Sequence, residues 1–149
     1  MSDSYQRSPA GAGEAGGPQQ TGGAPSPDSR LPGEHAVIRE IVAGLTKISG
    51  VLGAVLTAED GMPIAAELSE GMDEGRVAAM AAEIGRTTGE SLERVERGPM
   101  GFAMFDAERG KMFLGQAGKG FLVVLADHSV NLGLLRLEMT TAAERIRKL

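Results

Sequence analysis

Few side chains in this sequence could carry out chemistry, and its two histidines are the first to consider. His35 falls in the first turn of an expected helix, whereas His128 follows Asp127 at the end of an apolar run. An Asp-His pair could bind a metal ion or shuttle a proton, because imidazole titrates near neutral pH and ligates metals. No motif surrounds either histidine, so we expect a loop position whose polar groups are satisfied by backbone or water.

The run Gly115–Gly120 contains a Gly-Lys pair like that at the end of a phosphate-binding loop. Such a loop requires a glycine five residues before the pair and a serine or threonine after the lysine. Phe113 and Gly120 occupy those positions, so the run is interpreted as a turn between two strands. Motifs of the G-x-S-x-G and H-E-x-x-H types are missing as well. We therefore expect a binding or scaffold protein with no catalytic residues, no cofactor and no metal.

The composition of the 149-residue chain points away from several classes of protein. With 15 basic and 20 acidic residues and a net charge of −5, the whole chain does not favour nucleic acid as a partner. The absence of cysteine excludes disulfides and cysteine-ligated zinc, and it fits a reducing compartment. The longest strongly apolar run, Phe121–Ala126, is far shorter than a transmembrane helix, and the N-terminal residues do not form a secretory signal. We expect a cytoplasmic protein without membrane insertion.

The chain divides into a tail and one domain. Residues 1–33 are rich in Gly, Pro, Ser and Gln and almost lack large apolar side chains. Such a segment cannot bury enough surface to offset the entropy of ordering it, so we predict a disordered tail. The tail is either a passive solubilising arm or a docking segment, and its composition leaves both open. Residues 34–149 are predicted to form a single domain of ordinary size.

Hydrophobic spacing divides residues 34–149 into three helices and five strands. Pro63 cannot donate to a ladder, so its strand should lie at a sheet edge, and two apolar runs should be central strands. Asp60-Gly61 predicts a tight type I′ turn in the first hairpin. The fold class is α/β, a sandwich around a five-stranded, mainly antiparallel sheet. In chain order the predicted elements are helix Glu34–Ser49, strands Val51–Thr57 and Met62–Leu68, helix Asp73–Arg97, strands Met100–Asp106, Lys111–Gln116 and Phe121–Ala126, and a helix from about Asn131.

The central helix predicted at Asp73–Arg97 sorts its side chains onto three faces, at about 100° per residue. An ordinary surface helix has one apolar and one polar face, so this helix should meet two solid neighbours and solvent. Its charges are also spaced for weak intrahelical ion pairs, which leaves a merely solvated face as an alternative. The large apolar face comprises Val77, Met80, Ala81, Ile84, Thr88, Leu92 and Val95, the small face comprises Ala78, Ala82, Gly85 and Gly89, and the charged face comprises Arg76, Glu83, Arg86, Glu90 and Arg94.

Four segments follow one another in a recognisable order: Ile48–Leu56, Asp60–Ala65, Arg76–Ala82 and Asn131–Glu138. Together they resemble the roadblock family, of the dynein light chain 7 type, and most closely its free-standing bacterial members. The resemblance covers the whole predicted domain and implies a roadblock/longin-like α-β-β-α-β-β-β-α sandwich. It also implies the strand order 2-1-5-4-3, with the first and last helices on one face of the sheet and the central helix on the other.

The same resemblance implies a function, a non-enzymatic regulator or platform for small Ras-like GTPases. Relatives of the mutual-gliding-protein B type act as co-GTPase-activating proteins that reposition the partner's own catalytic groups without inserting an arginine finger. Other bacterial relatives belong to gene clusters that also encode a sensor kinase. A sensing or adaptor module linked to a histidine kinase, without direct GTPase activation, is therefore the alternative.

Members of the family pair their third strands edge to edge and pack their central helices together, which implies a homodimer. Glycine inside a helix is unfavourable, so we expect the small face to gain a close contact with its twin helix. The charged face of both subunits would then form the floor on which a GTPase sits. The expected dimer residues are Ala78, Ala82, Gly85, Gly89, Phe102 and Met104, and the expected partner-binding residues are Arg76, Glu83, Arg86, Glu90 and Arg94.

Overall fold

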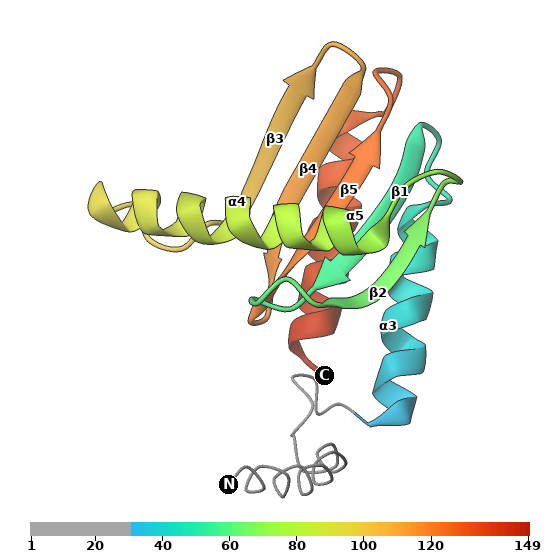
Figure 1. Ribbon diagram of the computed structural model, residues 1–149, viewed down its shortest axis with the longest axis horizontal. Coiled ribbons are helices and arrows are strands. Elements are labelled where there is room, and N and C mark those ends of the chain that lie inside the picture. The colour runs from blue at the N-terminus through green and yellow to red at the C-terminus, as the bar shows by residue number, and fades with distance from the viewer. Residues whose placement is uncertain (1–30) are drawn as a thin grey trace, which may run out of the picture.

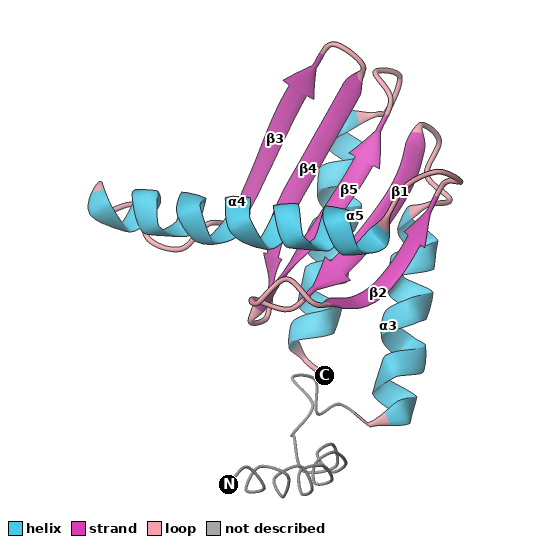
Figure 2. Ribbon diagram, viewed as in Figure 1, coloured by secondary structure: helices cyan, strands magenta, loops and turns pink. Residues whose placement is uncertain are grey.

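The computed structural model describes residues 31–149, so nearly all of the predicted tail lies outside the described residues. Residues 31–149 form three helices and five strands in the predicted order (Figure 2). None of these helices is long and apolar enough to cross a membrane. The elements are α3 (Pro32–Leu45), β1 (Val51–Thr57), β2 (Pro63–Leu68), α4 (Glu74–Arg94), β3 (Phe102–Ala107), β4 (Gly110–Ala117), β5 (Gly120–Ala126) and α5 (Leu132–Arg147).

The helix α3 ends four residues earlier than the spacing of apolar residues predicted. The Thr46 hydroxyl donates to the carbonyl oxygen of Ala43 at 2.7 Å, and the Thr46 N–H donates to the same oxygen at 3.1 Å. Such local hydrogen bonds compete with continuation of a helix. Ile48 nevertheless packs against the core from the following turn, which explains why the apolar period extends beyond the helix.

The five strands form one antiparallel sheet in the order β2-β1-β5-β4-β3, as the family resemblance implied (Figure 1). The apolar strands β1 and β5 lie inside the sheet, and β2, which begins at Pro63, lies at an edge. The ladder between β1 and β2 shifts register between Leu56 and Thr57. At the opposite edge, β3 pairs with β4 without any shift. One edge of the sheet is therefore interrupted and the other is regular.

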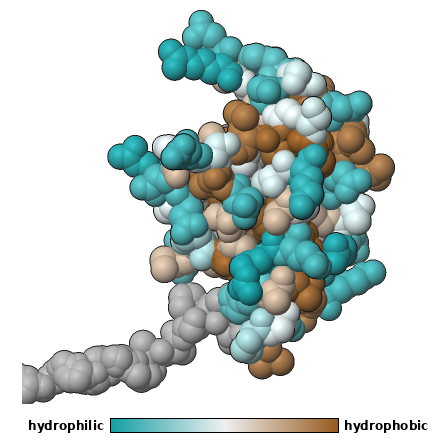
Figure 3. All heavy atoms as spheres, turned by 90° about the vertical axis from the view of Figure 1, so that its right-hand side faces the viewer, coloured by the Kyte–Doolittle hydropathy of each residue, from teal (hydrophilic) through white to brown (hydrophobic). Residues whose placement is uncertain are grey.

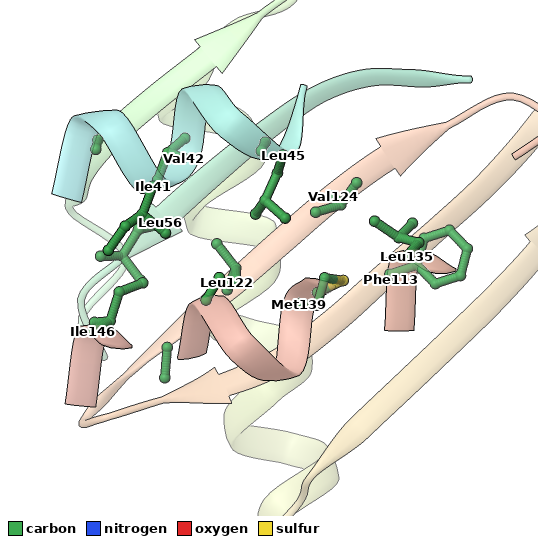
Figure 4. Close-up of a cluster of buried hydrophobic side chains, with 14 of the residues drawn as sticks. Ile41, Val42, Leu45, Leu56, Phe113, Leu122, Val124, Leu135, Met139 and Ile146 are labelled. Carbon is green, nitrogen blue, oxygen red and sulfur yellow. The ribbon is translucent and has the colours of Figure 1, made fainter. Parts of the chain in front are cut away.

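Two apolar clusters hold three layers together. The helices α3 and α5 cover one face of the sheet, and α4 crosses the other face (Figure 1). In the first cluster, Leu56, Phe113, Leu122 and Leu135 are fully buried between the sheet and the α3–α5 layer (Figure 4). Burial of each such side chain contributes about 1.5–3 kcal/mol. The second cluster, under α4, contains Val55, Ala78, Ala81, Ala82, Met100, Leu114, Phe121 and Val123.

The loop between β1 and β2 is not the predicted type I′ turn. That turn needs positive φ at both central residues, and Gly61 has φ +93° whereas Asp60 has no positive φ. The loop is longer, because the Ala58 N–H donates to the Met62 carbonyl oxygen at 2.9 Å. The Asp60 carboxylate stabilises it by accepting from the Met62 N–H at 3.0 Å. Gly61 then lies against α4, where an added Cβ would be 3.3 Å from the Cα of Ala79.

Candidate functional site

Two hydrogen bonds stabilise α4, one at its start and one along its charged side. The Asp73 carboxylate accepts a hydrogen bond from the Arg76 N–H at 3.1 Å, the usual role of aspartate at a helix N-terminus. Further along, the Arg86 guanidinium donates to the carbonyl oxygen of Glu59 in the β1–β2 loop. The first contact stabilises the start of α4, and the second ties its charged side to the β1–β2 loop.

The small face of α4 packs on the sheet of its own subunit. The prediction that this face contacts a twin helix is therefore wrong for three of its four residues. Ala78 and Ala82 are at most 1% exposed, and Gly85 is buried. The ring of Phe121 from β5 lies against Gly85, where an added Cβ would be 2.6 Å from the ring atom Cδ1. The missing side chains thus allow close approach to the sheet rather than to a twin helix. Gly89 has no heavy atom within 4 Å of an added Cβ, and its predicted contact stays a prediction.

The larger apolar side chains of α4 flank this contact and are only partly covered. Val77 and Ile84 are half-buried against the second cluster, and Met112 of β4 is half-buried beside the same cluster. Phe105 pairs with Met112 across the ladder and is 37% exposed. Figure 3 shows a hollow between α4 and the tips of the strands, with hydrophobic atoms at its base. We call Val77, Ile84, Phe105 and Met112 the apolar flank.

The edge strand β3 carries the other two predicted dimer residues. Alternation along a strand places Phe102 and Met104 on the face that α5 covers. Phe102 packs against the first cluster, with its ring centroid 5.9 Å from that of Phe113, whereas Met104 is 44% exposed. The prediction missed Phe105, which alternation places on the α4 face. That same alternation is the signal that could have identified it.

The charged face of α4 points to solvent, as predicted. The intrahelical ion pairs suggested by its spacing are not formed, because the ion pairs of residues 31–149 lie on other elements. Arg86 is the member of the face that is anchored to another element, through its hydrogen bond to the β1–β2 loop. The charges of this face are therefore available to an outside partner without the loss of an ion pair inside the described chain. The exposed members are Arg76, Glu83, Arg86, Glu90 and Arg94.

His128 connects the loop after β5 to the β3–β4 hairpin. Its Nε2 lies 2.9 Å from the carbonyl oxygen of Glu108, and its Nδ1 lies 3.7 Å from Oδ1 of Asp106. The Lys111 ammonium donates to the same Asp106 oxygen at 2.9 Å, and this hydrogen bond holds the pKa of Asp106 below its usual value. The histidine contacts a backbone carbonyl in a loop, which agrees with the structural role expected from the sequence.

Asp127 has partners of its own in the same loop. Its carboxylate accepts from the Ser129 hydroxyl and from the Ser129 N–H, the latter at 2.9 Å. The hydrogen bond from the hydroxyl is the main reason that the pKa of Asp127 is lowered. Within residues 31–149, no three His, Cys, Asp or Glu side chains are grouped so that they could hold a metal ion.

An open cavity of ≈ 240 Å³ lies between α5 and the start of β3. Phe102 and Arg136 both line it, and the Arg136 guanidinium carbon lies 5.0 Å from the centroid of the Phe102 ring. A cation over an aromatic face is attracted by the ring's quadrupole. Arg136 forms no ion pair with any carboxylate of the described residues. An exposed arginine is thus held next to the edge strand without an anionic partner.

Comparison with known sequences identifies a family and two relatives. The Roadblock/LC7 domain family matches residues 37–126. Two uncharacterized proteins of Methanocaldococcus jannaschii are 35% and 34% identical to this chain over 111 residues. Each match covers 74% of this chain and 97% of the relative.

Comparison with solved structures finds the same fold. The Roadblock/LC7 domain from Streptomyces avermitilis has a TM-score of 0.69 at 20% identity and covers 74% of this chain and 94% of its own. MglB of Myxococcus xanthus has a TM-score of 0.73 at 20% identity, covering 80% and 91% of the two chains. The gliding protein MglB of Thermus thermophilus has a TM-score of 0.73 at 16% identity, covering 84% and 96%.

Proposed function

Because the chain belongs to the Roadblock/LC7 domain family, we propose that it is a non-enzymatic, homodimeric platform for a small Ras-like GTPase. On this proposal it modulates the GTPase cycle in the manner of a co-GTPase-activating protein. The observation that carries the proposal is the charged face of α4, which is exposed and holds no ion pair within the described residues. A row of unpaired charges of both signs on a rigid helix suits electrostatic recognition of a protein surface.

The homodimer is supported by two neighbouring features. The edge strand β3 has no proline and no register shift, and it exposes Met104 and Phe105. Edge strands of this kind invite pairing with another strand unless something covers them. Two members of the apolar flank, Phe105 of β3 and its ladder partner Met112 of β4, lie at this edge, and neither is fully buried. A second copy that pairs with β3 would cover both, so the dimer contact is proposed at β3 and the apolar flank.

The GTPase is proposed to bind on the charged face of α4 in this dimer. The family resemblance points to this class of partner, and the structures similar to this chain include the gliding protein MglB. On this proposal the chain would act by repositioning the partner's own catalytic groups, the mode of action that the family resemblance implies. Arg76, Glu83 and Glu90 would interact with the partner without first breaking an ion pair with another described residue.

The test is a charge reversal of three central residues of the face, Glu83→Lys, Arg86→Glu and Glu90→Lys. Binding to a small Ras-like GTPase from the same genome, loaded with a non-hydrolysable GTP analogue, is measured by biolayer interferometry. We expect the dissociation constant to rise by about tenfold or more, because each close charge pair across an interface contributes about 1.5 kcal/mol or more. GTP hydrolysis by the same GTPase should lose its stimulation in parallel.

A matched control reverses three exposed charges on the opposite side of the molecule, Arg39→Glu, Glu40→Lys and Glu138→Lys. This control changes the net charge by the same amount, and it should leave binding unchanged. Unchanged affinity of the α4 variant, in a folded dimer, would move the site away from α4. Recovery of a sensor kinase with no GTPase from the native cell would favour the kinase-linked alternative instead.

A further inference from the structure

We propose that β3 pairs with its copy in one register, antiparallel about a two-fold axis through Met104. In this register Arg136 of each subunit meets Asp106 of the partner subunit. The inference rests on the homodimer proposed above and adds the register and the residues that determine it. It follows from two charged groups at opposite ends of β3 on the same face: the Arg136 guanidinium over Phe102, and the Asp106 carboxylate, which also accepts from Lys111.

The basic end is created by α5. Arg136 lies over the ring of Phe102, at the start of the strand, and has no carboxylate partner among the described residues. The acidic end is Asp106, four residues further along β3 and therefore on the same face. Four residues of strand span about 13 Å, so the two charges of one subunit are too far apart to pair with each other.

A two-fold axis between two subunits brings these opposite charges together. In an isologous contact, residue i meets residue j of the partner and residue j meets residue i. In an antiparallel pair, directly opposite residues point to the same face of the sheet. The two-fold axis between a strand and its copy must therefore pass through a residue, because an axis between two residues would pair side chains that point to opposite faces. Pairing about Met104 places Phe102, and with it Arg136, opposite Asp106 of the partner subunit. Each dimer then contains this contact twice.

The two registers centred one residue away from Met104 match fewer side chains. Pairing about Ala103 places Phe102 opposite Met104 of the partner subunit and leaves Asp106 beyond the paired region. Pairing about Phe105 places the Asp106 carboxylate opposite the apolar Met104. Pairing about Met104 also sets Phe105 opposite Ala103 on the α4 face, so a large side chain lies over a small one. The register about Met104 therefore matches charge on one face and size on the other.

The Asp106 carboxylate can still accept a hydrogen bond from Arg136 of the partner subunit. Lys111 and His128 both approach its Oδ1, and the side chain is 59% exposed. The other carboxylate oxygen has no partner within the described residues. An ion pair exposed to this degree adds little affinity to the dimer. Its effect is on the register, because in any other register these charges either lose their partner or lie beside a like charge. The exposed apolar side chains of β3, Met104 and Phe105, would supply most of the affinity.

The register can be read by cysteine cross-linking, because the chain contains no native cysteine. Ala103→Cys, Met104→Cys and Phe105→Cys are oxidised separately with copper phenanthroline, and covalent dimer is followed by denaturing gel. Opposite Cβ atoms are about 4.5–5.5 Å apart, whereas diagonal neighbours are about 7–8 Å apart. We expect Met104→Cys to cross-link fastest. Faster cross-linking at 103 or 105, or equal rates at all three, would overturn the register.

The charge contact is tested by mixing two variants, Arg136→Glu and Asp106→Arg. Each alone places like charges together and should raise its dimer dissociation constant by about tenfold. In a mixture, both contacts of the heterodimer join opposite charges, so native mass spectrometry should show heterodimer well above half of all dimers. Arg145→Glu mixed with Asp60→Arg is the control and should give the statistical half. A statistical mixture of the test pair would refute the Arg136–Asp106 contact.

The two proposals fail in distinguishable ways. If sedimentation shows the wild-type chain to be monomeric, and no cysteine variant cross-links, the homodimer itself is wrong. If the wild type is a dimer but none of the three positions cross-links, the contact lies away from β3. Circular dichroism of each variant shows that a loss of dimer does not come from unfolding.

Discussion

The ring of Phe121 fills the space beside Gly85, so close that an added Cβ would stand 2.6 Å from both Cδ1 and Cζ. This contact presses the small face of α4 onto the sheet. It also leaves Val77 and Ile84 only partly covered and the charged face exposed to solvent. A single pair of residues, one large and one without a side chain, thus determines which face of the central helix is available.

Replacing Gly85 with alanine should destabilise the protein, although alanine is the better helix former. Overpacking a core costs about 1–3 kcal/mol, and alanine gains roughly 1 kcal/mol over glycine inside a helix. We expect a net loss of about 1 kcal/mol in the free energy of unfolding, measured with urea. Gly89→Ala is the matched control, and it should stabilise because nothing lies within 4 Å of its added Cβ. Equal effects of both substitutions would contradict the contact with Phe121.

Glu96 lies two residues after the last residue of α4 and adopts a left-handed conformation, with φ +59°, which glycine tolerates better than glutamate. The Arg97 N–H donates to the Leu92 carbonyl and the Glu96 N–H to the Glu93 carbonyl, the hydrogen bonds of a Schellman motif. Glu96→Gly should therefore raise the free energy of unfolding by about 1 kcal/mol. Thermal unfolding of Glu96→Ala separates backbone strain from charge. If alanine stabilises as much as glycine, strain at this residue is not the cause.

Acid should weaken the loop that leads into α5. Folding lowers the pKa of Asp127 below its ordinary value of 3.8, mainly through the Ser129 hydroxyl. A lowered carboxyl pKa stabilises the fold at pH above that ordinary value, and this contribution is lost as pH falls through the folded-state pKa. Ser129→Ala should raise the pKa of Asp127 in an NMR titration and leave that of Asp106 where it is. An unmoved Asp127 titration would show that Ser129 does not control it.

Removing the exposed aromatic ring of the apolar flank should weaken the proposed dimer. Phe105 is 37% exposed, and a second copy on β3 would bury it. Phe105→Ala should raise the dimer dissociation constant by about tenfold, because only the exposed third of the ring is newly buried but this happens in both subunits, for a total of about 1–2 kcal/mol. Analytical ultracentrifugation provides the measurement. Met62→Ala removes an exposed side chain from the β1–β2 loop and should have no effect; equal weakening by both would argue against this contact.

The elements and their order were predictable because they depend on local periodicity. Val51–Thr57 is nearly all apolar or small and Phe121–Ala126 is apolar throughout, as is typical of strands covered on both faces, and the structure places both inside the sheet. Pro63 marked an edge because it lacks an N–H. The strand order itself came from the family resemblance, since periodicity does not determine which strands are neighbours.

Local periodicity could not predict which neighbour each face of α4 contacts. Angular spacing groups Ala78, Ala82 and Gly85 on one stripe and Val77 and Ile84 on another, but it does not say which stripe meets the sheet. The prediction placed the larger side chains against the sheet, and Val77 and Ile84 do pack there, although only partly buried. The structure adds the small face to this contact, because Ala78, Ala82 and Gly85 are buried against the sheet as well. The deciding factor is the bulk of Phe121, which belongs to a strand 36 residues further along the chain.

The sequence by itself thus determined the element types, the buried strands and the charged face of the central helix, because each depends on residues close together in the chain. Only the tertiary structure decided that the small face is used inside the subunit and that Phe105 joins the exposed surface. It also brought Arg136 over the edge strand that carries Asp106. These relationships depend on the packing of side chains from distant elements, which no local pattern encodes.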